Sequence, residues 1–308
     1  MNIQRISWDG LQRAWSAKAA FIGAIDAQLP GPQDTLDTAR EEERVELLKH
    51  FANWLMILDF AILNLASHVA SLSQASDRRK DERLLSVRAL LSHATQHAIG
   101  IRHCCIAGLD GPSRVLLRSL VEALTMAFVC ACKRDIAAEY IAAQGPDESR
   151  EVWRRYFTIG KLRPILEDID RQGGLEAEVS ADMLGWWHSS LENWSKFSHG
   201  AYVPILMSVW GRPPSTPDTA TMTVMGRCTI GLLSVLDQSF KWCALGLIRI
   251  NHALTDGPTP TLVLDTQDPV DGPCLIGPSV LGLVAQAVWL EAKEQRQPYG
   301  DWWMFPLE

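Results

Sequence analysis

The fold of this chain is best approached from the stretch GPSRVLLRSLVEAL, residues 111–124. Its apolar residues cover most of a helical circumference, whereas Arg114, Arg118 and Glu122 recur at every fourth position and therefore share one stripe. Because unpaired charges are costly to bury, Arg118 and Glu122 should pair with each other or meet a polar group from another helix. The simplest arrangement is an intrahelical pair at a bundle surface, worth only about 0.3–0.5 kcal/mol.

Proline positions divide the rest of the chain, because proline breaks helix interiors. Apolar residues recur at helical spacing between the prolines, and Asp110 is a plausible cap for the helix that follows it. The expected helices span residues 8–25, 38–73, 80–107, 113–143, 149–169 with a break at Pro164, 181–197 and 223–254. The prediction is an all-α fold: a bundle of about seven main helices over residues 1–255, with a proline-rich, mostly irregular C-terminal segment, 256–308, packing on it.

Composition excludes several classes of protein. With 47% hydrophobic and 21% charged residues, the 308-residue chain is neither disordered nor collagen-like. Its 29 Lys and Arg against 36 Asp and Glu give a net charge of −7, which disfavours nucleic-acid binding by bulk charge but not by a local basic groove. The composition therefore does not indicate what the protein binds.

The cysteines and the most apolar segment bear on the cellular compartment. Seven cysteines without a Cys-x-x-Cys spacing are expected to be reduced and buried, and the first 15 residues show no export signal, so a cytoplasmic protein is expected. Residues 51–72 are apolar but are interrupted by Asp59, Asn64 and His68. We therefore expect a buried helix with interhelical hydrogen bonds there and no membrane contact.

A second polar segment ends the helix expected at 181–197. There His199 follows Ser198 and precedes Gly200, a position where an imidazole is both exposed and held. His199 is therefore either a C-terminal cap whose charge suits the helix dipole or a group for proton transfer or ligand binding.

These segments carry a resemblance to a known family. The run LLRSLVEA at 116–123, after the turn at Gly108 and followed about eighty residues later by Ser198-His199-Gly200, resembles uncharacterised bacterial all-helical proteins. Those proteins are remotely similar to the HEPN (higher eukaryotes and prokaryotes nucleotide-binding) superfamily. The resemblance covers roughly residues 50–250. It implies binding or metal-independent cleavage of RNA or a nucleotide, a role in bacterial stress or phage defence, and a homodimer.

The family pattern is incomplete in this chain. Active members place an arginine before the histidine with four to six residues between them, and none of Glu192, Asn193 and Trp194 is arginine. Arg118 and Glu122, from another helix, are the candidates to complete a catalytic set with His199. The expected ligand-binding residues are Arg114, Asn193, Lys196 and Ser198. The alternative is a non-catalytic helical scaffold or a small-ligand-binding protein in which the same residues stabilise the core.

Other motifs are weaker. His93 and His97, four residues apart, could chelate a metal from one helix face, but no further ligand motif accompanies them. A polar face or an interhelical hydrogen bond is the preferred interpretation, and we expect no metal site and no cofactor. The chain also lacks the glycine-rich dinucleotide and phosphate-binding loops and a Gly-x-Ser-x-Gly elbow, which argues against Rossmann, P-loop and α/β-hydrolase enzymes.

Overall fold

The computed structural model describes residues 32–199, 210–211, 214, 221–222, 226–255, 277–278 and 280–284. Two compact units are distinguished, Met1–Glu42 and Glu43–Glu308. In the first unit, the structure describes only the beginning of one helix. The expected helix at 8–25 and most of the C-terminal segment lie outside the described residues.

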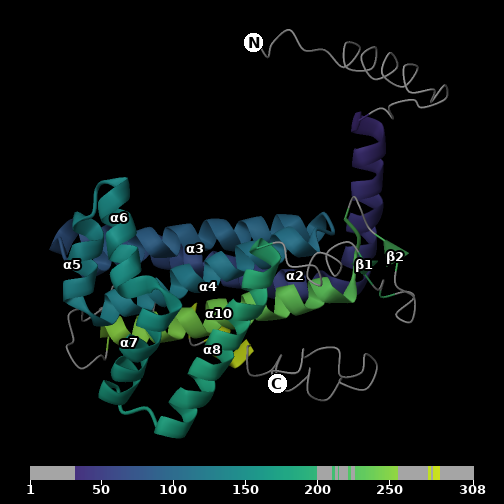
Figure 1. The fold of residues 1–308 in the computed structure, drawn as a ribbon. Coiled ribbons are helices and arrows are strands. Elements are labelled where there is room, and N and C mark those ends of the chain that lie inside the picture. The colour runs from purple at the N-terminus through teal and green to yellow at the C-terminus, as the bar shows by residue number, and fades with distance from the viewer. Residues whose placement is uncertain are drawn as a thin grey trace, which may run out of the picture. The chain divides into compact units, whose positions relative to one another are not determined.

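The described chain is all-α, as the sequence predicts (Figure 1). The helices are α2 (Pro32–Arg79), α3 (Glu82–Ile106), α4 (Asp110–Cys132), α5 (Arg134–Ala142), α6 (Pro146–Val152), the π-helical turn η2 (Trp153–Phe157), α7 (Ile159–Gln172), α8 (Ala177–Ser198) and α10 (Ile230–Thr255). Two strands of two residues each, β1 (Trp210–Gly211) and β2 (Thr221–Met222), pair antiparallel.

Two of the predicted helices are each divided by a residue with an extended backbone. The helix expected at 113–143 divides at Lys133, whose backbone is extended, so α4 and α5 are separate. The helix expected at 149–169 breaks at Thr158, and Pro164 lies inside α7. Pro164 has no N–H to donate to the Gly160 carbonyl four residues earlier. The helix tolerates this because both residues are exposed, so water can bond that carbonyl.

Helix α4 lies at the centre of the bundle, packed against α3, α8 and α10 (Figure 1). The side chains of Leu117, Leu120 and Leu124 on α4 are almost completely buried. Gly246 of α10 allows close packing, because a Cβ atom at Gly246 would lie 3.1 Å from Leu124 Cδ2. Truncating a buried leucine such as Leu120 to alanine typically costs about 2–5 kcal/mol.

The turn between α3 and α4 is bound to the segment that leads into α10. The Arg227 N–H donates to the Gly108 carbonyl over 2.9 Å. Gly108 has φ +70° and Gly226 has φ +89°, and a Cβ atom on Gly108 would lie 2.4 Å from Arg227 N. These glycines bring the two backbones into contact and thereby align the beginnings of α4 and α10.

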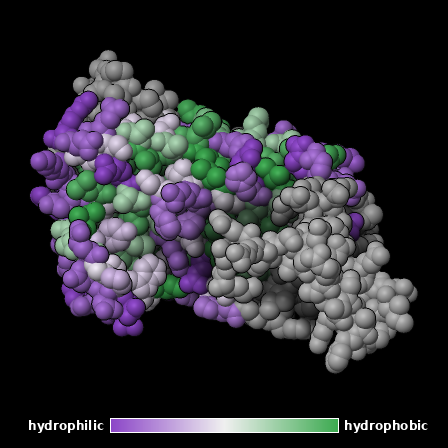
Figure 2. Space-filling model, turned by 90° about the horizontal axis from the view of Figure 1, so that it is seen from above, coloured by the Kyte–Doolittle hydropathy of each residue, from purple (hydrophilic) through white to green (hydrophobic). Residues whose placement is uncertain are grey.

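Two described helices are long and apolar enough to cross a membrane, by length and composition alone: Glu41–Arg78 and Asp110–Cys132. The apolar window of the second is 67% buried inside the fold, and core helices of soluble proteins pass the same test. The first has exposed hydrophobic side chains, including Val45, Met56 and Leu63. Figure 2 shows hydrophobic and hydrophilic side chains interspersed on one face of the molecule. This is weak evidence for a membrane span.

The described part of the C-terminal segment contacts the bundle. Leu281 is completely buried in the hydrophobic core. A Cβ atom at Gly282 would lie 3.2 Å from Ile248 Cδ1 on α10, and one at Gly277 would lie 2.1 Å from Asn64 Oδ1 on α2. Residues 277–284 therefore pack closely where the structure describes them.

Candidate functional site

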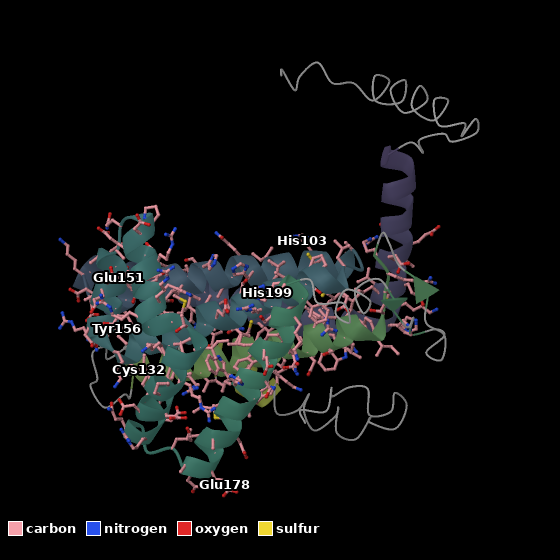
Figure 3. The ribbon with its side chains drawn as sticks, in the orientation of Figure 1. His103, Cys132, Glu151, Tyr156, Glu178 and His199 are labelled. Atoms are coloured by element: carbon pink, nitrogen blue, oxygen red, sulfur yellow. The ribbon has the colours of Figure 1, made fainter. Side chains whose placement is uncertain are left out.

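Two arginines of α4 reach the last turn of α8. Arg118 Nη1 donates to Ser198 Oγ over 3.2 Å. One turn earlier on α4, the Arg114 guanidinium lies over the ring of Phe197, 5.1 Å from its centroid. Phe197 and Ser198 directly precede the exposed His199, which marks the end of α8 in Figure 3. The stripe on α4 thus meets the C-terminal end of α8.

Arg118 is held by two partners from different helices. Its Nε donates to Glu122 Oε1 over 3.0 Å, and both side chains are about one-fifth exposed. The expected intrahelical pair is therefore present, and Ser198 adds a second contact from α8. No acceptor among the described residues contacts Arg118 Nη2, so donor capacity remains for a ligand.

Arg114 has a different environment. It is 4% exposed, its Nε donates to Asp110 Oδ1 over 2.9 Å, and its Nη2 donates to the Gly231 carbonyl over 3.1 Å. Arg114 therefore ties α4 to α10 and to Phe197 from inside the fold. The expectation that Asp110 caps α4 was wrong, since Leu109 is the capping residue and Asp110 pairs with Arg114 in the first turn.

The end of α8 gathers the remaining predicted residues. The exposed Lys196 donates through Nζ to Asn193 Oδ1 over 3.3 Å. Ser198 Oγ and the His199 N–H both donate to the Ser195 carbonyl, over 2.9 and 3.0 Å. The backbone of His199 therefore caps the C-terminal end of α8. The His199 side chain remains exposed.

The polar groups of this α4–α8 site suit a small anion. We define the site as Arg118, Glu122, Ser198 and His199. Asn193 and Lys196 are not brought into it: they bond to each other, and Lys196, two residues before Ser198, lies on the opposite side of α8. Arg118 is cationic with Glu122 as its counterion, and Ser198 and His199 add donors or acceptors. A guanidinium, a hydroxyl and an imidazole at one helix end can bind a phosphate oxygen, and the imidazole can also transfer a proton.

His93 and His97 contact each other on the surface of α3. Their Nε2 atoms are 2.9 Å apart, and the rings meet edge to face. Burial and the neighbouring His93 lower the pKa of His97. Within the described ranges, no group of three or more His, Cys, Asp or Glu side chains could hold a metal ion. The pair forms a polar face on one helix and does not bridge two helices.

The polar residues of α2 have only in part the interhelical partners expected of them. Asp59 pairs with Arg102 of α3, and Arg102 Nη2 donates to Asp59 Oδ2 over 3.0 Å. Asn64, in contrast, donates to the Phe60 carbonyl of its own helix. His68 is 2% exposed with both ring nitrogens unsatisfied in the described structure, and burial lowers its pKa to about 4. His68 is therefore neutral near pH 7.

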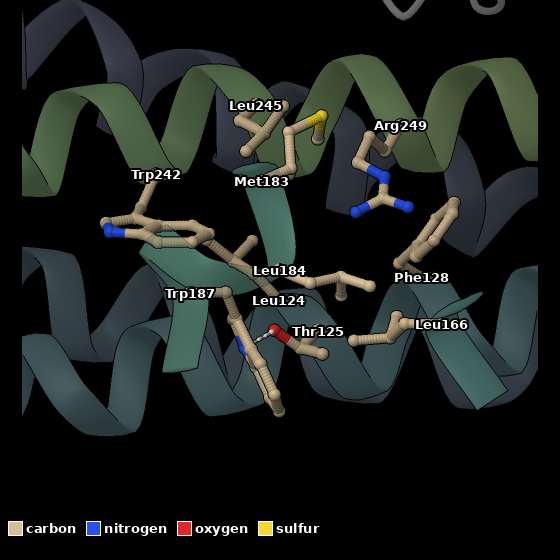
Figure 4. Close-up of a pocket in the computed structure, with 11 residues that line it drawn as sticks. Leu124, Thr125, Phe128, Leu166, Met183, Leu184, Trp187, Trp242, Leu245 and Arg249 are labelled. Atoms are coloured by element: carbon tan, nitrogen blue, oxygen red, sulfur yellow. Dashed lines mark hydrogen bonds between the residues drawn. The ribbon is translucent and has the colours of Figure 1, made fainter. Parts of the chain in front are cut away.

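The structure also contains a pocket that sequence reasoning missed. It lies among α4, α7, α8 and α10, and Figure 4 shows Arg249 and two tryptophans at its wall. The available signal was a charge in an apolar helix, since Arg249 stands between Ile248 and Ile250. Such an arginine needs a buried partner or a ligand.

No protein-family model matches this chain, and no curated protein or solved structure is significantly similar to it.

Proposed function

We propose that the protein binds RNA or a nucleotide through its phosphate at the α4–α8 site. The observation that carries this proposal is the hydrogen bond from Arg118 to Ser198, because it brings a guanidinium to the residue next to the exposed His199. Arg118 is about one-fifth exposed and keeps an Nη2 donor edge, whereas Arg114 is 4% exposed and bonds Asp110 and Gly231 inside the fold. We therefore assign phosphate binding to Arg118, and a structural role to Arg114.

The same arrangement supports a mechanism for RNA cleavage. Cleavage without metal needs a base for the 2′-hydroxyl, an acid for the leaving oxygen and a cation for the charge on the phosphorane. We propose His199 as the base that takes the 2′-hydroxyl proton and Arg118 for the charge, with a water molecule supplying the proton to the leaving oxygen. Glu122 would be a positioning residue, since it holds Arg118 Nε over 3.0 Å. In this scheme Arg118 replaces, from another helix, the arginine that is absent at positions 192–194.

Binding is tested with a fluorescein-labelled single-stranded RNA and fluorescence anisotropy. We expect Arg118→Ala to weaken binding at least tenfold, because hydrogen bonds to a charged group contribute about 1.5–3 kcal/mol. The matched control is Arg163→Ala on α7. Arg163 Nε also bonds the glutamate four residues later over 3.0 Å, but Arg163 is 54% exposed and has no hydrogen bond to α8 within the described part of the chain. Equal affinity of wild type and Arg118→Ala, or an equal loss in Arg163→Ala, would contradict the proposal.

Cleavage is tested separately, with the same RNA in EDTA and with a 2′-deoxy analogue. We expect His199→Gln to abolish cleavage while RNA affinity changes less than threefold, and we expect the 2′-deoxy RNA to remain intact. Cleavage that survives in His199→Gln would refute the catalytic part alone. A thermal unfolding curve of each variant shows whether it is folded.

A further inference from the structure

We propose that the pocket among α4, α7, α8 and α10 is a second ligand site, which binds a small apolar monocarboxylate with its carboxylate on Arg249. This site is distinct from the α4–α8 site. It is lined by Leu124, Thr125, Phe128, Leu166, Met183, Leu184, Trp187, Trp242, Leu245, Gly246 and Arg249. Its cavity volume is about 30 Å³, and it opens to solvent on one side, so it has room for a short ligand only. Figure 4 shows the apolar side chains surrounding the space, with Arg249 beside it.

The walls favour an apolar ligand body. Leucines, Phe128 and two tryptophans supply most of the lining. The Thr125 hydroxyl is already occupied, since it donates to the Val121 carbonyl over 2.8 Å and accepts from Trp187 Nε1 over 3.2 Å. Concave apolar pockets with a few polar groups are the usual form of small-molecule sites.

Arg249 supplies the polar end of the pocket. Its Nη2 donates to Asp170 of α7, and its guanidinium lies over the Phe128 ring, 4.0 Å from the centroid. Asp170 also accepts from Ser180 Oγ over 2.8 Å. No acceptor among the described residues contacts Nε or Nη1 of Arg249. A guanidinium with five donors can therefore accept a carboxylate in addition to Asp170.

The surrounding charges favour an anion with one charge. Near the end of α7, Lys133 and Arg171 pair with Asp168, and Arg249 pairs with Asp170. Of these cations, only Arg249 lines the pocket. Burial lowers the pKa of Arg249 even though Asp170 opposes that shift. A monocarboxylate suits this guanidinium, whereas an amine would be repelled by it and a phosphate dianion would bring a second charge against apolar walls.

The probes are sodium propionate, 1-propanol and propylamine, which share a short apolar chain and differ in charge. Isothermal titration calorimetry on the full chain should show propionate binding at least tenfold more tightly than 1-propanol. Propylamine should bind more weakly than both. Equal binding of propionate and propanol, or no binding of propionate, would overturn the proposal.

Two variants locate the site. Removing Arg249 alone would leave Asp170 as a buried, uncompensated charge, so the double variant Arg249→Gln/Asp170→Asn is used, which keeps a neutral hydrogen-bonding pair. It should lose at least tenfold in propionate affinity and change propanol affinity less than threefold. Met183→Trp, on the partly exposed wall, should fill the pocket and weaken both ligands. A double variant that still prefers propionate to propanol, or unchanged binding in Met183→Trp, would refute this site.

Discussion

Arg118 and Ser198, eighty residues apart in the chain, are joined by a hydrogen bond of 3.2 Å between Nη1 and Oγ. The bond connects the charged stripe of α4 to the last turn of α8. It leaves Arg118 held by one partner on its own helix and one on the neighbouring helix, with about one-fifth of its side chain exposed. Such a residue is ordered before a ligand arrives, which reduces the entropy lost on binding.

Arg114 and Arg118 should differ in their effect on stability. Arg114→Ala leaves Asp110 buried without its partner and should cost about 3–5 kcal/mol in the free energy of unfolding. Arg118→Ala removes a pair that is about one-fifth exposed and should cost about 1 kcal/mol. Urea unfolding followed by circular dichroism measures both. Equal losses would contradict the separate roles assigned to the two arginines.

His68 should make stability depend on pH in the acidic range. Its pKa is lowered to about 4 in the folded protein, against 6.5 for the ordinary imidazole. Between these values the unfolded chain binds a proton that the folded chain does not, so stability is retained above pH 6.5 and is lost as the pH falls toward 4. The loss attributable to His68 should approach about 3 kcal/mol at the lower end.

The measurement is urea unfolding of wild type and His68→Leu at pH 7 and pH 5. The variant should unfold with a shallower pH dependence, because it lacks the buried imidazole. His103→Leu, which replaces an exposed histidine, is the control and should follow the wild-type pH dependence. An unchanged slope in His68→Leu would show that other groups cause the acid sensitivity.

Two glycines with similar backbone conformations should respond differently to alanine. Gly108 and Gly174 have φ values of +70° and +74°, but a Cβ atom would meet Arg227 N at 2.4 Å in the first case and nothing within 4 Å in the second. Gly174→Ala should therefore cost only the strain of a left-handed residue, about 1–2 kcal/mol. Gly108→Ala should cost several kcal/mol more, because the α3–α4 turn must separate from Arg227.

The melting temperatures of the two variants test this comparison directly. Similar decreases would mean that the contact between Gly108 and Arg227 contributes little beyond the backbone conformation. A much larger decrease in Gly108→Ala would establish that contact as the link that aligns α4 with α10.

The sequence by itself determined the all-α class and the shared stripe of Arg114, Arg118 and Glu122. Both depend on spacing within one helix, where periodicity fixes which side chains are neighbours. Helical periodicity did not predict the helix ends at Lys133 and Thr158, where residues with an extended backbone interrupt apolar patterns that continue on both sides. Their conformations depend on packing between helices, which no local pattern encodes.

Only the tertiary structure decided which of the stripe's arginines is available and where a pocket forms. Spacing places Arg114 and Arg118 on one stripe, and both were predicted as site residues. The packing of α8 and α10 on α4 nevertheless buries the first on Gly231 and brings the second to Ser198. The surroundings of Arg249 likewise come from four helices distant in the chain. Contacts of this kind depend on how the helices pack together, because each wall of the site belongs to a different helix.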